Sequence, residues 1–262
     1  MRADVYLVLF GYTESRKKAQ DLIAAGAVKI DGSVVKKSAA TVDEKIPHEV
    51  GIEQIFRYVS RGGMKLQAAL DAFGINVNGL KAADIGASTG GFTDCLLQRG
   101  AAKVYAIDSG TAQLHPSLAG DDRVITVERF NARNLTSEVT DGLCDIVVAD
   151  VSFISQTYII PPAASVLKNG GCFVSLIKPQ FEAGASALGK NGIVVNSAYR
   201  FLAAKRVISC ATENGFDCLA LIPSPITGGD GNHEYLAYFK KTGGMCINPK
   251  VDDKAIKRIT LL

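Results

Sequence analysis

The stretch that most constrains this chain is residues 82–94, AADIGASTGGFTD, in which a short apolar run meets a cluster of glycines. The run from Ala82 to Ile85 is typical of a buried β-strand. The glycines that follow permit a tight turn in which the backbone approaches a ligand closely. They are Gly86, Gly90 and Gly91. The pattern therefore predicts a strand, a turn and the start of a helix.

Polar residues around this turn indicate that it holds a cofactor. We expect Thr89 or Thr93 to cap a helix that runs to about Arg99, because threonine oxygens accept hydrogen bonds from the first helical N–H groups. Asp84, near the end of the strand, is suited to binding the ammonium or hydroxyl group of a ligand beside that helix start. An ordinary connection between strand and helix is the alternative interpretation.

The spacing of the glycines favours S-adenosylmethionine over a dinucleotide. Dinucleotide sites carry G-x-G-x-x-G, whereas this turn reads G-x-x-x-G-G from Gly86, with Ser88 in place of the second glycine. A pyrophosphate would find less room there, and S-adenosylmethionine has no phosphate. A second strand pattern, Lys103 to Ile107, is followed by Asp108, which is well placed for ribose hydroxyls. We therefore favour a site for a methyl donor.

The composition is that of a globular protein with one large core and a small additional module. The chain has 262 residues, of which 47% are hydrophobic, and no apolar run approaches the ~18 residues of a membrane span. Met1 to Phe10 includes Asp4 and lacks a signal-peptide cleavage pattern. We expect a cytoplasmic protein with no membrane partner.

Neither the cysteines nor the histidines indicate a metal site. The six cysteines never form C-x-x-C, and most lie in apolar patterns in which a reduced, buried thiol is expected. They are Cys95, Cys144, Cys172, Cys210, Cys218 and Cys246. His48, His115 and His233 lack the spacing of metal ligands, so no metal is predicted.

The net charge of +3 says little, but basic residues are concentrated near the N-terminus. Residues 15–37 contain six basic side chains and two acidic ones. Ser15 is expected to cap a helix that Gly26 closes, with one apolar face formed by Ala19, Leu22 and Ile23. Asp31-Gly32, between apolar residues, predicts the type I′ turn of a β-hairpin.

This layout, ESRKKAQDLIAAGAVKIDGSVVKK, resembles the S4-type RNA-binding module of ribosomal proteins, pseudouridine synthases and a tyrosyl-tRNA synthetase. In that family the helix that begins Ser-Arg and the following hairpin face RNA. The resemblance implies an α+β RNA-binding domain over residues 1–59, whose basic residues are Arg16, Lys17, Lys18, Lys29, Lys36 and Lys37. A solvated, charged helix is the alternative that the charges alone would favour.

A second domain is expected at 60–245, followed by a C-terminal tail at 246–262. Strand patterns recur at 103–107, 124–127, 144–149, 172–177, 217–222 and 235–239, with helices between several of them. This alternation predicts an α/β fold with a doubly wound, mostly parallel sheet. Ligands bind at the carboxyl ends of the strands in such sheets, where Asp150 and Lys178 join Asp84 and Asp108.

The most specific pieces of the sequence are YVSRGGMKL, ADIGASTGGFTD, VVADVSFIS, LIKPQFE and GNHEYL. Together they resemble the TlyA, or hemolysin A, family, which joins an S4-type module to a domain similar to the FtsJ ribose methyltransferases. The resemblance implies a Rossmann-like, S-adenosylmethionine-dependent methyltransferase fold. It also implies methylation of cytidine 2′-hydroxyls in ribosomal RNA, with the RNA or a ribosomal subunit as partner.

The resemblance also assigns the site residues. The Lys-Asp-Lys-Glu tetrad of FtsJ-like enzymes corresponds to Lys65, Asp150, Lys178 and Glu234. The cofactor-binding positions are Asp84, Gly86, Ser88, Thr89, Gly90, Gly91, Phe92, Asp108, Asn131 and Asp150. Asn131, in ERFNARNL, stands in for the acid that these enzymes place after the third strand to hold adenine.

The expected chemistry is an attack of a ribose 2′-oxygen on the sulfonium methyl, with loss of the hydroxyl proton. Lys178 is the candidate base, Lys65 a neighbouring cation that favours the neutral amine, and Asp150 and Glu234 align the lysines. Two other functions are a non-catalytic ribosome-assembly factor and a membrane-active cytolysin. The first would not need all four tetrad residues, and no signal peptide or long amphipathic segment supports the second.

Overall fold

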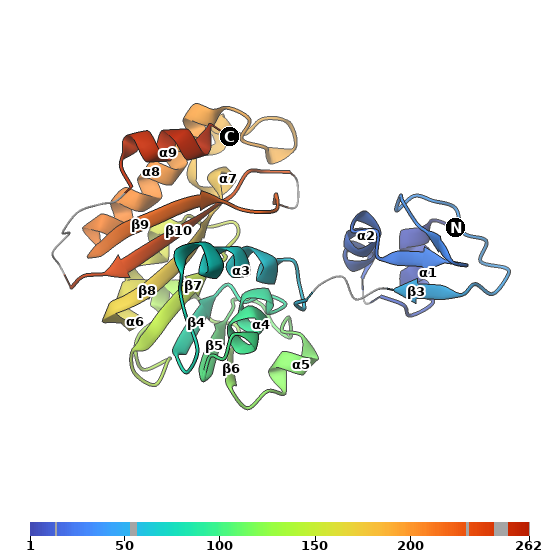
Figure 1. Ribbon diagram of the computed structural model, residues 1–262, viewed down its shortest axis with the longest axis horizontal. Helices are drawn as coiled ribbons and strands as arrows, with labels where there is room; N and C mark the ends of the chain where they lie inside the picture. Colours follow the sequence, from blue (N-terminus) through green and yellow to red (C-terminus); the bar gives the residue numbers. More distant parts are fainter. Residues whose placement is uncertain (14, 53–56, 229–230, 244–250, 262) are drawn as a thin grey trace. The chain divides into compact units, whose positions relative to one another are not determined.

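The computed structural model describes residues 1–13, 15–52, 57–228, 231–243 and 251–261 (Figure 1). The chain divides into two compact units, Met1–Arg57 and Tyr58–Leu262. This boundary lies two residues before the expected one. Tyr58 belongs to the second unit because its ring is buried and its hydroxyl donates a 2.9 Å hydrogen bond to Gln67 Oε1.

The first unit packs two helices, α1 (Ala3–Leu9) and α2 (Arg16–Ala24), with a three-stranded antiparallel sheet. The strands are β1 (Val28–Ile30), β2 (Ser33–Val34) and β3 (Val50–Ile52), in the order β2-β1-β3. The predicted cap is confirmed, because Ser15 Oγ accepts a 3.2 Å hydrogen bond from the Lys18 N–H. Asp31 (φ +50°) and Gly32 (φ +73°) adopt the left-handed conformations of the predicted hairpin turn.

The second unit is built on a seven-stranded sheet with the order β6-β5-β4-β7-β8-β10-β9. The strands are β4 (Lys81–Ile85), β5 (Lys103–Ile107), β6 (Val124–Val127), β7 (Cys144–Ala149), β8 (Leu167–Ile177), β9 (Phe216–Pro223) and β10 (Tyr235–Lys241). Strands β4 to β8 pair in parallel, and β10 runs antiparallel to both β8 and β9. The predicted doubly wound, mostly parallel α/β sheet is confirmed.

Helices cover both faces of this sheet (Figure 1). One face packs against α3 (Gly62–Phe73), α4 (Gly91–Gln98) and the short α5 (Pro116–Ala119). The other packs against α6 (Ile160–Val166), α8 (Ser197–Glu213) and α9 (Asp253–Thr260). Short helices occupy the loops: η1 (Ala132–Asn134), η2 (Gln156–Tyr158), α7 (Pro179–Glu182), η3 (Ala185–Ala187) and η4 (Lys190–Gly192).

The strand order fixes where a ligand can bind. After β4 the chain builds β5 and β6 on one side, then returns to place β7 on the other side of β4. The loops that follow β4 and β7 therefore diverge and leave a crevice at the carboxyl ends of these strands. The glycine turn at residues 86–91 and Asp150 both lie at this end of the sheet.

Three local predictions differ from the structure. Strand β8 begins at Leu167, five residues before the expected start, because Leu167 pairs with Cys144 of β7. The N-cap of α4 is Gly90 (φ +95°), not a threonine. Within the expected tail, α9 packs on α8 and buries Ile256, and the residues before it, 244–250, lie outside the described part of the chain.

Candidate active site

Asp84 is the next-to-last residue of β4, and its carboxyl group is fully buried. Its Oδ2 accepts a 2.7 Å hydrogen bond from Thr93 Oγ1, which explains why Thr93 does not cap the helix. Its Oδ1 is buried with no hydrogen-bond partner in the described part of the chain. Burial, reinforced by the negative charges of Asp150 and Asp108, raises the pKa of Asp84 to about 7. A buried acceptor that lacks a donor is suited to receiving one from a ligand.

The glycines of the turn are required by close contacts. Gly86 has φ +83°, and a Cβ added there would lie 2.6 Å from the carbonyl oxygen of Asp150. A Cβ on Gly91 would lie 2.2 Å from Ser60 Oγ and 2.9 Å from the backbone nitrogen of Gly63. The turn after β4 therefore touches the loop after β7 on one side and the start of α3 on the other.

A pocket of about 440 Å³ opens beside this turn, at the carboxyl ends of β4, β5 and β7. Five of the predicted cofactor positions line it: Gly86, Ser88, Asp108, Asn131 and Asp150. Sequence reasoning missed its other lining residues, which are Ile107, Ser109, Gln113, Phe130, Ala132, Val151, Ser152, Phe153, Ile154 and Ile159. Half of them are next to a predicted residue in the chain, and that proximity was the available signal.

The acid after β5 is held by the backbone. Asp108 Oδ2 accepts a 2.8 Å hydrogen bond from the Ser88 N–H, and Oδ1 accepts one of 2.7 Å from the Gly110 N–H. Ser88 reaches this position with φ +47°. Asn131 Oδ1 accepts hydrogen bonds from the backbone nitrogen and Nε of Arg133, at 3.1 and 3.2 Å, so its side chain also caps η1.

The remaining predicted cofactor positions are outside the lining of this pocket. Asp84, Thr89, Gly90 and Gly91 belong to the strand end, the turn and the helix start but do not line the pocket. The side chain of Phe92 is buried in the hydrophobic core, only 3% exposed. Its predicted contact with a cofactor stays a prediction.

Two lysine–carboxylate pairs lie at the same end of the sheet, and Asp150 is the one of their four residues that is only partly buried. Lys65 Nζ donates a 2.5 Å hydrogen bond to Glu234 Oε2. Lys178 Nζ lies 2.6 Å from Asp150 Oδ1 in an ion pair and directs a 2.8 Å hydrogen bond to Ser152 Oγ. Ser152 is the polar partner that sequence reasoning missed, although it follows Asp150 by only two residues.

The sheet register brings these pairs together from distant parts of the chain. Ile177 is opposite Tyr235 in the antiparallel β8–β10 pair, so Lys178 and Glu234 extend from the same end of that pair. Ala149 pairs with Ser175 in the parallel β7–β8 pair, so Asp150, which follows β7, lies beside the end of β8 that precedes Lys178. Lys65 reaches Glu234 from the first turn of α3. The four predicted catalytic residues thus gather at one edge.

The predicted RNA-binding residues all lie in the first unit. Arg16, Lys17, Lys36 and Lys37 are exposed, and Lys18 and Lys29 are half-buried. Arg16 Nη2 also donates a 3.2 Å hydrogen bond to the buried Asp4, so this arginine has a structural role. Lys17 Nζ lies 3.6 Å from the carboxylate of Asp21, one helical turn away.

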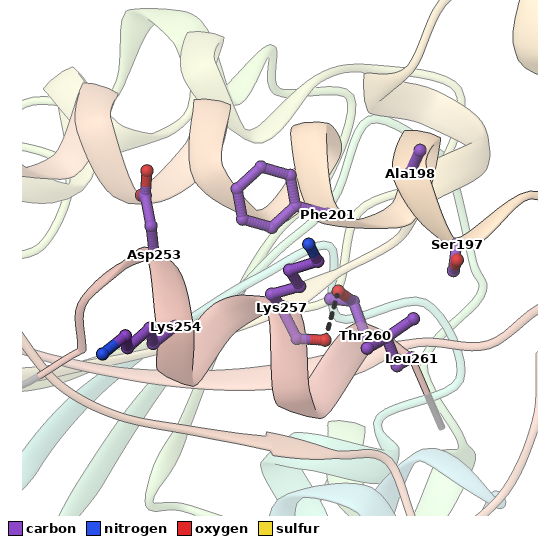
Figure 2. Close-up of a pocket in the computed structure, with 8 residues that line it drawn as sticks. All are labelled: Ser197, Ala198, Phe201, Asp253, Lys254, Lys257, Thr260 and Leu261. Atoms are coloured by element: carbon purple, nitrogen blue, oxygen red, sulfur yellow. Dashed lines mark hydrogen bonds between the residues drawn. The ribbon is translucent and has the colours of Figure 1, made fainter.

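A second cavity, of about 380 Å³, lies between α8 and α9 and contains none of the predicted site residues (Figure 2). Phe201 forms its apolar wall, and Lys254 and Lys257 lie on the α9 side. Among the residues that the structure describes, no three His, Cys, Asp or Glu side chains are grouped as metal ligands. No helix in those ranges has both the length and the apolar character needed to cross a membrane.

Comparisons with known proteins agree with this architecture. Residues 58–241 match the FtsJ-like methyltransferase family, and residues 1–45 match the S4 domain. Hemolysin A of Brachyspira hyodysenteriae is 45% identical over 240 residues, which cover 91% of this chain and 99% of that protein. The 16S/23S rRNA (cytidine-2′-O)-methyltransferase TlyA of Mycobacterium tuberculosis is 40% identical over 98% of this chain and 96% of its own length.

A solved structure of a hemolysin-like protein from Streptococcus thermophilus is 40% identical, covers all of this chain and 94% of its own, and superposes with a TM-score of 0.79. The resemblance to FtsJ-like enzymes noted from the sequence is thereby confirmed over most of the second unit. The chain belongs to the TlyA (hemolysin A) family, in which an S4 domain precedes an FtsJ-like methyltransferase domain.

Proposed function

We propose that this protein transfers the methyl group of S-adenosylmethionine to the 2′-hydroxyl of a cytidine in ribosomal RNA. The observation that carries the proposal is the presence of two lysine–carboxylate contacts beside the pocket at the carboxyl ends of β4 and β7. Relatives at 40% identity over nearly the whole chain carry the name of this activity. With such a substrate, we expect the protein to act in the cytoplasm.

The residues around the pocket fit the methyl donor. The partnerless Oδ1 of Asp84 is suited to an ammonium group, and Asp108 to the hydroxyls of a ribose. Ser88 replaces the glycine that a pyrophosphate would need, and Asn131 is our candidate for the adenine contact. When bound, S-adenosylmethionine supplies an electrophilic methyl group on a positively charged sulfur.

The tetrad then has to orient a ribose hydroxyl and take up its proton. A hydroxyl is a weak nucleophile, so both its position and a nearby base matter. Lys178 is the proposed base, and Asp150 and Ser152 fix its amine within 2.6 and 2.8 Å. Lys65, held by Glu234, supplies the second lysine of the tetrad.

The first unit is the proposed RNA-binding part of the protein. Its S4 match and its exposed basic residues suit it to phosphates, which dominate the affinity of such interfaces. A ribosomal subunit would therefore be bound by the first unit and modified by the second.

The test is methylation of purified 30S and 50S subunits, and of their naked RNAs, with labelled S-adenosylmethionine. We expect label at a small number of cytidine riboses, mapped as positions resistant to alkaline hydrolysis. Label on bases or on protein, or binding of RNA and cofactor with no transfer to any of these substrates, would overturn the proposal. The last result would favour a non-catalytic assembly factor.

A further inference from the structure

The end of α1 exposes an unusual amount of apolar surface for so small a unit. Leu9 is 65% exposed, Phe10 50% and Tyr12 39%, and the three lie within four consecutive residues. Small domains rarely leave neighbouring large apolar side chains in water unless the surface binds something. The basic residues already described do not account for this surface.

The exposed rings are ordered by a buried one. The Phe10 ring stacks on Tyr6 with 4.4 Å between ring centroids and 27° between the planes. Tyr12 lies 6.3 Å from the same ring, at 18°. Tyr6 is only 2% exposed, so it is a buried support for Phe10, and Phe10 itself keeps 50% of its surface exposed to solvent. The two outer rings are thus nearly parallel to a fixed base.

The surrounding backbone and side chains hold this arrangement in place. The N–H groups of Tyr12 and Thr13 both donate to the carbonyl of Leu7, at 2.8 and 3.1 Å, and fold the chain back over α1. Tyr6 also makes a T-shaped contact with the His48 ring, at a centroid distance of 5.8 Å and an interplanar angle of 81°. His48 in turn contacts Asp31 in the hairpin turn at 2.6 Å.

The positive charge of the first unit indicates what kind of ligand these aromatic rings would bind. Four residues after Tyr12, helix α2 begins with the exposed Arg16 and Lys17, and Lys36 and Lys37 are exposed beyond β2. Open aromatic faces combined with cations are the means by which proteins bind unpaired nucleic-acid bases, because every base has a face that can stack. An apolar protein surface would offer these exposed cations no negative charge.

We propose that Phe10 and Tyr12 form a stacking platform for unpaired bases of the RNA held by the first unit. This inference rests on the proposed function, since it assumes an RNA substrate, and it adds that the RNA presents single-stranded nucleotides at the end of α1. The basic residues bind phosphates regardless of base pairing, and the platform selects loops or bulges over continuous duplex.

The sequence offers a direct reporter, because the chain contains no tryptophan. Phe10→Trp introduces a single fluorophore at the platform. Leu202→Trp, at a 54% exposed position on α8, is the matched control. The RNA probes are a ribosomal RNA hairpin with an unpaired loop and a fully paired duplex of equal length, each carrying a terminal label whose anisotropy reports binding independently.

We expect the hairpin to quench the Phe10→Trp fluorescence and to leave Leu202→Trp unchanged, with much weaker quenching by the duplex. Phe10→Ser with Tyr12→Ser should weaken hairpin binding by roughly 10-fold to 100-fold, given the usual worth of base–aromatic stacking. The slope of log affinity against log salt should stay the same, since no phosphate contact is lost. Lys36→Gln with Lys37→Gln should reduce that slope instead.

Phe10→Leu separates stacking from apolar docking, because leucine keeps most of the apolar area and removes the ring. Weaker hairpin binding by this variant supports the platform. Wild-type binding by Phe10→Leu, or bound hairpin that fails to quench Phe10→Trp, overturns it, and the first result would indicate a protein partner for this surface. Either result leaves the proposed methyl transfer intact, whereas the absence of any RNA binding by the wild type removes both proposals.

Discussion

Lys65 and Glu234 stand 169 residues apart in sequence, yet the lysine Nζ donates a 2.5 Å hydrogen bond to the glutamate Oε2 in a nearly water-free setting. Both residues are buried, with 8% and 4% of their surfaces exposed. The carboxylate fixes the direction of the lysine side chain. The second pair, Lys178 with Asp150, is anchored by a further hydroxyl, that of Ser152. Because Lys178 is held by two partners and is the proposed base, it is the residue to test first.

Lys178→Ala is expected to lower the rate of methyl transfer by at least ~10²-fold, the low end of the usual contribution of a general base. Lys178→Arg should fail almost as badly, because a guanidinium keeps the charge but does not give up its proton. Single-turnover methylation of a tightly bound RNA measures both rates. Calorimetry should show cofactor affinity nearly unchanged.

Lys168 provides a matched control, since its ion pair with Asp145 joins the same two strands, at 2.5 Å, but at their opposite end. Lys168→Ala should retain normal rates. Near wild-type transfer by Lys178→Arg would contradict the assignment of the base and leave the proton to water or Asp150.

Cofactor affinity is expected to depend on pH through Asp84, whose pKa burial raises to about 7. A ligand ammonium favours the ionised carboxylate, so affinity should fall as the pH drops below about 7, by at most about tenfold per pH unit. Titrations in two buffers of different ionisation enthalpy should detect a proton released on binding near pH 6. Asp84→Asn should bind more weakly and without this pH dependence; a flat wild-type profile would place the ammonium elsewhere.

The same carboxyl affects the stability of the cofactor-free protein. Its folded pKa of about 7 exceeds the ordinary value, so between about pH 4 and pH 7 the unfolded chain ionises while the folded one stays protonated. This group therefore stabilises the fold at low pH, and its contribution is lost as the pH rises through that window. Denaturant unfolding of Asp84→Asn should lack that part of the pH dependence.

Gly86→Ala is expected to reduce stability and activity more than the strain of a positive φ alone would. The added Cβ meets the Asp150 carbonyl oxygen at 2.6 Å, so the loop that carries Asp150 must move. Gly79 has a similar φ of +73°, but a Cβ there meets nothing within 4 Å, which makes Gly79→Ala the control for backbone strain. We expect Gly79→Ala to cost about 1 kcal/mol and remain active. Gly86→Ala should unfold at a lower temperature and lose activity; equal behaviour of the two variants would rule out the contact.

Removal of residues 1–57 should leave a folded methyltransferase unit that binds cofactor and has lost most RNA affinity. The cut must spare Tyr58 and Val59, because the Tyr58 hydroxyl bonds Gln67 and the Val59 N–H donates to Asp94 Oδ2 at 2.7 Å. Filter binding against salt measures the loss, and circular dichroism checks the fold. Unchanged RNA affinity in the truncated protein would move the recognition surface to the second unit.

Reversing charge at Lys17 and Lys36 should reproduce the effect of the truncation in the full-length chain. Arg16 is less suitable for this test because it bonds the buried Asp4, and an acidic residue there would disturb the fold. Both lysines are exposed, so their loss should reduce the salt dependence of binding without changing stability.

Features that depend on neighbours in the chain could be predicted from the sequence. The turn at Asp31-Gly32, the Ser15 cap and the strands around the glycine cluster follow from backbone preferences and apolar alternation over a few residues. The resemblance to a family also allowed the four residues of the tetrad to be predicted. The glycines were predicted as well, although the reason that Gly86 is needed, the Asp150 carbonyl, was not visible.

What only the tertiary structure decided are the contacts across strands and between loops. Whether Lys65 meets Glu234, and Lys178 meets Asp150, depends on the register of β10 on β8 and of β8 on β7, which no local pattern specifies. Local patterns also do not specify that Thr93 donates a hydrogen bond to Asp84 instead of capping its helix. Nor do they specify that α9 packs against α8. The sequence determines which functional side chains are present, but the packing of segments far apart in the chain determines which partner each side chain contacts.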